Sequence, residues 1–158
     1  MHGFKDSANR YWAVRVDVGA VKRVRAALGV DLMQVAERKN AEGGREPGVL
    51  ERLASDPVLL VDVIYVLCRD QAEAQGVSDE NFGATMAGDA LDHAVKAMLG
   101  AIVDFFPNPR ERAALKRVLA AAELEADRAR DRMEALVEEK LAPSPAGGSW
   151  PSRRPSSD

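Results

Sequence analysis

A run of apolar residues, DPVLLVDVIYVLC at positions 56 to 68, is interrupted only by Asp56 and Asp62. Many of its residues are β-branched, which favours a strand, but Asp56 followed directly by Pro57 is typical of a helix N-cap and first helical position. The run is too short to cross a bilayer, which requires about 18 apolar residues. We therefore predict an interior helix over residues 57 to 68, with Asp62 on a narrow polar edge, followed by a connector, RDQAEAQG.

Residues 4 to 18 have the pattern of a β-hairpin. Asp6-Ser7-Ala8-Asn9 is a turn-forming set in which Asn9 tolerates the left-handed conformation. The segment that follows alternates in polarity, and its apolar face would consist of Trp12, Val14, Val16 and Val18. Because a two-stranded hairpin is marginal by itself, we expect this face to pack on helices.

The segment after the hairpin predicts a helix, a loop and a second, short helix. In AVKRVRAALG, an apolar stripe ends at Gly29, a typical residue just beyond a helix; the stripe is Val21, Val24 and Leu28. Residues 30 to 35 have no clear type, and residues 36 to 48 are expected to form a polar, glycine-rich loop. A short helix is predicted near residues 49 to 54.

Two more helix starts are predicted from local signatures. Ser78 is a predicted N-cap, with Val77 and Phe82 at the two positions of a hydrophobic staple. A further helix restarts at Gly88-Asp89 and ends before Pro107. Its core face would consist of Leu91, Val95, Met98, Leu99, Ile102 and Phe106.

The longest helix is predicted to begin at a capping box with proline at the first helical position, NPRE at residues 108 to 111, and to extend to about Leu141. Apolar residues in it alternate at spacings of four and three, the pattern of a coiled-coil seam. This heptad seam consists of Leu115, Leu119, Ala122, Ala126, Ala129, Met133 and Leu136. Two interpretations remain open: the seam packs on its own bundle, or it accepts a helix of another chain.

Composition and charge limit the class of protein. The 158 residues are 46% hydrophobic, which suits one domain with a core, and the formal charge of −3 argues against a general binder of nucleic acid or anionic membranes. The single cysteine, Cys68, has no internal disulfide partner, and residues 1 to 10 lack the pattern of a signal peptide. We expect a cytoplasmic protein without a membrane-spanning segment, and a disordered Pro/Ser/Gly-rich tail from Pro143.

Candidate catalytic and metal-binding residues are few. Asp89 and His93 share a helical face, but no second histidine or cysteine cluster completes a metal site. Cys68 and His93 could form a nucleophile pair, although a cysteine in an apolar helix is more often a small core residue. Gly43-Gly44 lacks the Gly-Lys-Ser/Thr ending of a phosphate loop. We therefore expect no enzyme activity, no metal and no cofactor.

The first predicted helix carries a local excess of positive charge. Lys22, Arg23 and Arg25 lie on its outer face and could contact phosphate groups. A solvated helix face is the simpler interpretation, because few aromatic residues accompany these cations. Nucleic-acid binding is therefore a secondary hypothesis.

Three segments together resemble a known family. They are FKDSANRYWAVRVDVGAVKRVRAALGVDL, LERLASDPVLLVDVIYVLC and QGVSDENFGATMAGDALDHAVKAMLGAIVDFFP. The order of a hairpin, a helix, a DP-x-LL helix, a GVS-x-E-x-F helix start and a helix ending in FFP is similar to that of small phage or prophage tail assembly chaperones. The resemblance covers roughly residues 4 to 107. One departure is Gly19, which stands where a helix-capping Asp or Asn would be expected.

This resemblance implies a non-enzymatic protein that binds the long, helical tape measure protein before the tail tube polymerises around it. It also implies that a longer form can arise by ribosomal frameshifting near the end of the reading frame. Two alternatives stay open beside it. The heptad seam could join copies of this chain in a homo-oligomer, or the basic helix could serve a nucleic-acid accessory protein.

These observations predict a mainly α fold with a small N-terminal β-hairpin (α+β), in which a helical bundle precedes a long C-terminal helix and a disordered tail. The expected parts are a hairpin and helical core over residues 1–107, a charged and alanine-rich helix over 108–142, and the tail over 143–158. The predicted partner-binding residues are those of the heptad seam, and the expected partner is a tape-measure-like helical protein.

Overall fold

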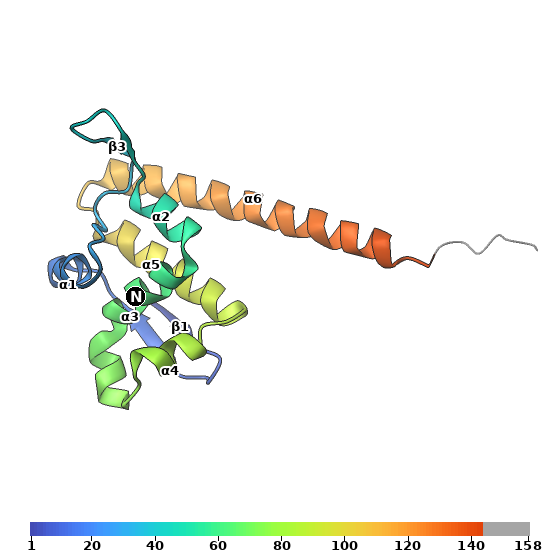
Figure 1. Ribbon diagram of the computed structural model, residues 1–158, viewed down its shortest axis with the longest axis horizontal. Coiled ribbons are helices and arrows are strands. Elements are labelled where there is room, and N and C mark those ends of the chain that lie inside the picture. The colour runs from blue at the N-terminus through green and yellow to red at the C-terminus, as the bar shows by residue number, and fades with distance from the viewer. Residues whose placement is uncertain (144–158) are drawn as a thin grey trace, which may run out of the picture. The chain divides into compact units, whose positions relative to one another are not determined.

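The computed structural model describes residues 1 to 143 and shows a mainly helical chain that begins with a small β-hairpin, as predicted (Figure 1). The chain consists of two compact units: the first is Met1–Leu115, and the second begins at Lys116. The predicted disordered tail lies, apart from Pro143, outside the described residues. The elements are β1 (His2–Lys5), β2 (Tyr11–Val14), α1 (Val18–Leu28), β3 (Arg38–Lys39), β4 (Arg45–Glu46), α2 (Val49–Ser55), α3 (Pro57–Gln75), α4 (Asp79–Ala84), α5 (Asp89–Phe105) and α6 (Pro109–Leu141).

The N-terminal hairpin is shorter than its alternating sequence predicts. β1 and β2 are antiparallel, with His2 opposite Val14, and the turn between them holds Asn9 in the predicted left-handed conformation at φ 63°. The second strand was expected to continue to Val18, and this is wrong. Val18 is instead the first residue of α1, with 59% of its surface exposed.

The early end of β2 has a local cause in the capping of α1. The Asp17 carboxylate accepts a hydrogen bond from the Ala20 backbone N–H at 2.8 Å, so Asp17 is the N-cap. The expectation that Gly19 occupies the capping position of α1 is therefore wrong. The capping residue is Asp17, two residues earlier, so glycine at position 19 does not weaken the helix start. At the other end, Gly29 closes α1 in the left-handed conformation, as predicted.

The apolar run at residues 56 to 68 is helical and largely buried, as predicted. The Asp56 carboxylate caps α3 by accepting from the backbone N–H groups of Val58 and Leu59. The predicted connector after Cys68 is wrong, because α3 continues to Gln75. Ala72 within that extension is fully buried, so tertiary packing stabilises turns that are polar in sequence.

The polar loop predicted over residues 36 to 48 contains a second, minimal hairpin. Arg38–Lys39 and Arg45–Glu46 pair as antiparallel strands, and Gly43 takes a positive φ of 79° in the turn. The Arg45 guanidinium contacts two carboxylates, those of Glu37 at 2.6 Å and Glu51 at 2.9 Å. The glycine pair thus serves a turn. Strands of two residues are too short for an alternation of apolar and polar residues to be recognised in the sequence.

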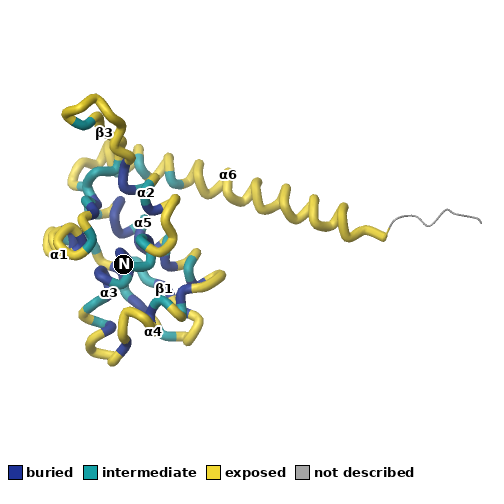
Figure 2. The backbone as a smooth tube through the Cα atoms, in the orientation of Figure 1, coloured by how far each residue is buried: buried dark blue, intermediate teal, exposed yellow. Residues whose placement is uncertain are grey.

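The core of the first unit lies between the hairpin, α3, α4 and α5, where Figure 2 shows the buried residues gathered. Its centre is aromatic. Phe82 of α4 has no exposed surface and lies edge-on to Trp12 and Tyr65, at centroid distances of 5.0 and 5.3 Å. Ser78 caps α4 as predicted, with its hydroxyl accepting from the Asn81 N–H. Such edge-to-face pairs add to the stabilisation from burial itself.

The outer edge of β2 is closed by a side chain instead of a third strand. The Gln71 side-chain oxygen accepts from the Ala13 backbone N–H at 2.9 Å, and its amide NH2 donates to the Ala13 carbonyl at 2.7 Å. One amide therefore reproduces both hydrogen bonds of a neighbouring strand. This pairing attaches the hairpin to α3 and occupies an edge that would otherwise be open to another chain.

We expect Gln71→Glu to lower the free energy of unfolding by about 2 kcal/mol, because the carboxylate would face the Ala13 carbonyl with no proton to donate. Chemical denaturation at neutral pH measures this change. Gln75→Glu, an identical substitution at the exposed end of α3, is the control and should change stability by less than about 0.5 kcal/mol. Equal effects of the two substitutions would contradict the role given to Gln71.

Within residues 1 to 143, no helix combines the length and the apolar character needed to cross a bilayer.

Candidate partner-binding surfaces

α6 carries the predicted partner-binding residues on one uninterrupted helix. None of its residues is buried: Leu115 and Leu119 are half-buried, and the other members of the heptad seam are exposed (Figure 2). Met133 and Leu136 expose 66% and 53% of their surface. Because their spacing alternates between three and four residues, the seam residues share one face of the helix.

The predicted Asn108 cap and Pro109 at the start of α6 are confirmed, but the Glu111 hydrogen bond of a capping box is not among the described contacts. The Asn108 side chain accepts from the Arg110 N–H at 2.9 Å, with Pro109 at the first helical position. The Arg112 guanidinium donates to the Phe106 carbonyl at 2.7 Å, which fixes the turn between α5 and α6. Leu115, the first residue of the heptad seam, lines a groove in the first unit. Its other apolar lining residues are Met33, Val35, Ala36, Phe106 and Ala114.

Charged residues on both sides of the heptad seam have opposite signs in successive turns. Glu123 and Glu125 flank its first half, and Arg130 and Arg132 flank its second half. Glu125 also accepts from Arg128 at 2.8 Å within the helix, and such exposed pairs at helical spacing contribute only a few tenths of a kcal/mol. The seam therefore combines an apolar stripe with an ordered pattern of charge.

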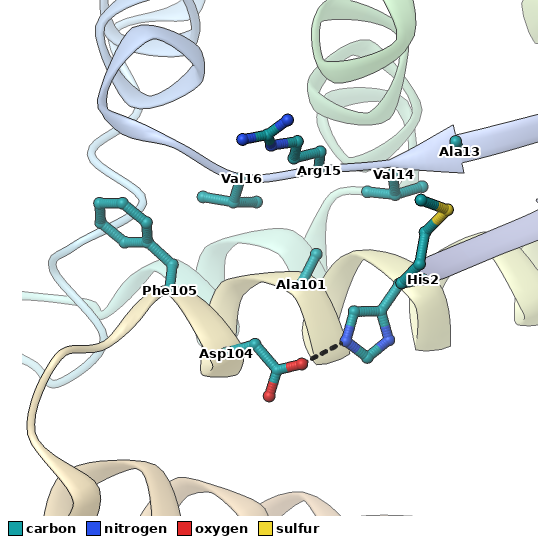
Figure 3. Close-up of a pocket in the computed structure, with 9 residues that line it drawn as sticks. His2, Ala13, Val14, Arg15, Val16, Ala101, Asp104 and Phe105 are labelled. Carbon is teal, nitrogen blue, oxygen red and sulfur yellow. Dashed lines mark hydrogen bonds and ion pairs between the residues drawn. The ribbon is translucent and has the colours of Figure 1, made fainter.

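A cavity of about 520 Å³ lies between the end of β2 and α5, and Figure 3 shows its lining. Val14, Val16 and Phe105 give it an apolar wall. His2 closes it on one side, with its Nε2 2.7 Å from an Asp104 carboxylate oxygen. Its size and apolar wall are those of a small-molecule site, and the His2–Asp104 pair supplies the polar groups nearby.

A second groove, of about 470 Å³, is lined by both apolar and acidic residues. Val58 and Val61 of α3 are among the apolar ones, and Asp62 and Asp79 are among the acidic ones. Burial raises the pKa of Asp62, and the negative charges of Asp79 and Asp56 raise it further. The groove therefore favours a ligand with an apolar body and a positive charge.

A buried carboxylate organises the hairpin turn, and sequence reasoning missed it. Asp6 is 5% exposed, and its two oxygens accept from Arg10, Trp12 and Thr85 side chains and from two backbone N–H groups. Thr85 ends α4, so Asp6 connects the hairpin to that helix. The signal in the sequence is an aspartate followed at four and six residues by two side chains that can donate hydrogen bonds.

The pKa of Asp6 reflects two opposing causes. Burial raises this pKa, but the hydrogen bonds from the Trp12 indole and from Arg10, together with the Arg10 charge, outweigh burial and leave the pKa below its ordinary value. The carboxylate is therefore ionised at neutral pH. It is fully engaged in hydrogen bonds, so its role is structural.

The residues considered for catalysis or metal binding lie on two helices: Cys68 is in α3, and Asp89 and His93 are four residues apart in α5. Burial raises the pKa of Cys68 to about 12, so its thiol is protonated at neutral pH and is not a nucleophile. His93 is exposed on α5. No group of three or more histidine, cysteine or acidic side chains in residues 1 to 143 has the arrangement of a metal site.

The basic residues of α1 do not act as one free cationic patch. Lys22 and Arg23 are exposed, but the Arg25 guanidinium lies 2.8 Å from the Asp31 carboxylate. Burial raises the pKa of Asp31, while hydrogen bonds from the Met33 N–H and Arg25 lower it more, so the net shift is downward. This carboxylate therefore neutralises part of the charge on which phosphate binding would depend.

Comparisons with protein-family models, with curated proteins and with solved structures find no match for this chain.

Proposed function

We propose that this protein is a non-enzymatic assembly chaperone of the phage tail type, which binds a helical, tape-measure-like client in the cytoplasm. One observation carries the proposal: α6 extends over 33 residues, buries none of them, and presents an apolar seam on one face. An amphipathic helix with such a seam binds another helix through side chains spaced by three and four residues. The resemblance of residues 4 to 107 to tail assembly chaperones supports the same assignment.

The composition of the heptad seam suits reversible binding. Its middle positions are alanines, Ala122, Ala126 and Ala129, which allow another helix to approach closely while burying little apolar surface. Larger apolar residues stand at its two ends, and Met133 can adapt its shape to different neighbours. A helix held in this way can be released when another interaction competes for it, as tail assembly requires.

The first unit serves as the scaffold in this proposal. Its packed core supports α5, and the Arg112 hydrogen bond to the Phe106 carbonyl fixes the first turn of α6 to the end of α5. The acidic groove between α3 and α4 offers a second place where a client with basic residues could be held. Binding is assigned to the heptad seam because its apolar residues extend from Leu115 to Leu136 along one face of a single helix.

Co-expression with the longest coiled-coil-rich protein encoded just downstream tests the proposal. We expect that protein to be insoluble alone, and to become soluble and co-purify when the full chain is present. A downstream protein that stays insoluble in both conditions would overturn the proposed function.

We expect Ala126→Glu to weaken client binding by about tenfold or more, since a carboxylate in the centre of the seam would be desolvated without a partner. Its melting temperature should stay within about 2 °C of the parent, because Ala126 is exposed. Ala121→Glu introduces the same side chain at an exposed position of α6 outside the seam, and it should retain binding. At a concentration where the parent is monomeric, a large fall in melting temperature for Ala126→Glu would show that the seam belongs to the core instead.

A further inference from the structure

We propose that the free protein pairs with a second copy of itself through α6, with the two helices antiparallel and with Ala126 of one copy opposite Ala129 of the other. This inference concerns the chain alone and does not depend on the identity of a client. It starts from the exposed heptad seam and from the charges that flank it, which together select one partner, one direction and one register.

The apolar layers of this pairing are well matched in size. In this antiparallel register six of the seven seam residues lie opposite a residue of the other half of the seam, and Leu115 lies opposite Lys140. The central layers set alanine against alanine, which permits close approach. The next layers set Ala122 against Met133, and the outer layers set Leu119 against Leu136. The layers therefore increase in size from the centre of the interface to its ends, and Met133 and Leu136, both more than half exposed in the single chain, become covered.

The four central flanking charges are complementary on both sides of the seam in this register, whereas Lys116 and Glu139 near its ends face Val137 and Val118. Flanking residues of antiparallel helices face residues at the equivalent flanking position of the second copy. Glu123 then faces Arg130 of the second copy, and Glu125 faces Arg132. The two-fold symmetry repeats each contact, so all four charged residues meet an opposite charge.

Neighbouring antiparallel registers reverse this complementarity. Moving the symmetry axis by one layer toward the start of α6 sets Glu123 against Glu123 and Glu125 against Glu125 of the second copy. Moving the axis by one layer in the other direction sets Arg130 and Arg132 against themselves. Like charges at flanking positions disfavour a pairing, so both shifted registers are selected against.

A parallel pairing matches the same charges less completely. It keeps Glu125 opposite Arg130 and brings Glu111 near Lys116, but Glu123 and Arg132 would each face a valine. It also stacks Lys140 on Lys140 at the next position of the seam. Antiparallel helices in addition bring the ends of opposite partial charge together. These differences favour the antiparallel arrangement.

The ion pairs already present within α6 are compatible with this interface. Glu125 accepts from Arg128 through one carboxylate oxygen, Oε1, and the second oxygen can accept from the other copy. Arg130 contacts Asp127 through one guanidinium nitrogen at 3.3 Å, and an arginine guanidinium carries five N–H donors. Exposed ion pairs within a helix contribute only a few tenths of a kcal/mol, so their rearrangement on pairing costs little.

Self-pairing would cover the heptad seam until a client is present. If the seam also holds a client, as the proposed function states, client and second copy compete for the same face, and the dimer is the resting form. This consequence rests on the proposed function, whereas the dimer itself does not.

Charge reversal in the full chain tests the pairing. The double variant Glu123→Arg with Glu125→Arg and the double variant Arg130→Glu with Arg132→Glu each place like charges across the interface, so each should dissociate about tenfold or more readily than the parent. Mixing the two variants restores opposite charges at every contact and should restore the dimer. Sedimentation velocity over a range of concentrations measures all four samples.

Direction and register are tested by cysteine cross-linking with Ala122→Cys and Met133→Cys, made as separate chains. In the proposed pairing these positions face each other, whereas copies of the same position lie about 16 Å apart along the axis, too far for a disulfide. A disulfide dimer should form only in the mixture of the two chains. Native Cys68 is fully buried and does not interfere.

Three results would overturn the inference. They are a parent chain that sediments as a monomer at its highest soluble concentration, reversed variants that dimerise alone as well as the parent does, and disulfides that form within each single-cysteine variant alone. None of these measurements involves a client. A failure of self-pairing is therefore distinguishable from a failure of the proposed function, which the co-expression experiment reports.

Discussion

Phe82→Ala is expected to lower the free energy of unfolding by about 4 kcal/mol, the largest effect of any single substitution considered for this protein. Phe82 is fully buried, and its ring lies edge-on to both Trp12 and Tyr65. Truncation removes the buried ring and leaves a cavity between the hairpin, α3 and α4. Urea denaturation followed by circular dichroism measures the loss.

Phe82→Leu separates the contribution of the aromatic contacts from that of the cavity. Leucine fills most of the volume but cannot form the edge-to-face pairs, so we expect a loss of about 1.5 kcal/mol for this variant. Phe105→Ala, at a half-buried residue of α5, should cost less than Phe82→Ala. A loss below about 2 kcal/mol for Phe82→Ala would mean that the three rings are not the centre of the core.

Asp6→Ala is expected to lower the free energy of unfolding by about 3 kcal/mol at neutral pH. The substitution leaves the Trp12 indole N–H and the Arg10 guanidinium without the acceptor that both contact. The Arg10 side chain is 28% exposed, so water can replace part of the lost interaction. The expected loss of stability is therefore at the lower end of the range for breaking a buried ion pair. The hairpin should also detach more readily from α4, because Asp6 accepts from the Thr85 hydroxyl.

The pH dependence gives an independent check on Asp6. Its folded-state pKa lies below its unfolded-state value, so its contribution is fully present above the ordinary aspartate pKa, near about 4, and is lost as pH falls through the lowered value. The difference in stability between the parent and Asp6→Asn should therefore be constant at neutral pH and shrink in acid. Asp17→Ala, which removes the α1 N-cap, is the control and should cost about 1 kcal/mol.

A difference between parent and Asp6→Asn that stays constant down to pH 2 would contradict the role of the ionised carboxylate. An Asp6→Ala variant no less stable than Asp17→Ala would do so as well, because it would reduce Asp6 to the importance of one helix cap.

The candidate surface on α6 was predictable because it depends on spacing alone. The alternation of three and four residues from Leu115 to Leu136 is visible in the sequence, and so is the Asn108 cap that starts the helix. Whether the side chains of that stripe are exposed depends on what else the chain packs against them. The sequence left both interpretations open, and only the structure shows that none of the α6 residues is buried.

Local signals in the sequence were sufficient for several helix caps and for the hairpin turn, although the cap of α1 was expected at Gly19 and is Asp17. Asp56, Ser78 and Asn108 cap the helices that they were predicted to cap, and Asn9 takes the left-handed turn conformation. Each of these outcomes follows from hydrogen bonds or steric preferences that span at most four residues. The main helices and the N-terminal hairpin of the first unit are thus determined by the sequence itself.

Tertiary structure decided the features whose partners lie far away along the chain. Ala72 extends α3 because it is buried, and Gln71 takes the place of a third strand because α3 passes beside Ala13. Asp6 connects the hairpin to α4 only because the fold places Thr85, 79 residues later in the chain, within hydrogen-bond distance of its carboxylate. Periodicity and capping patterns cannot report such contacts, because the energies that select them arise only after distant segments have packed together.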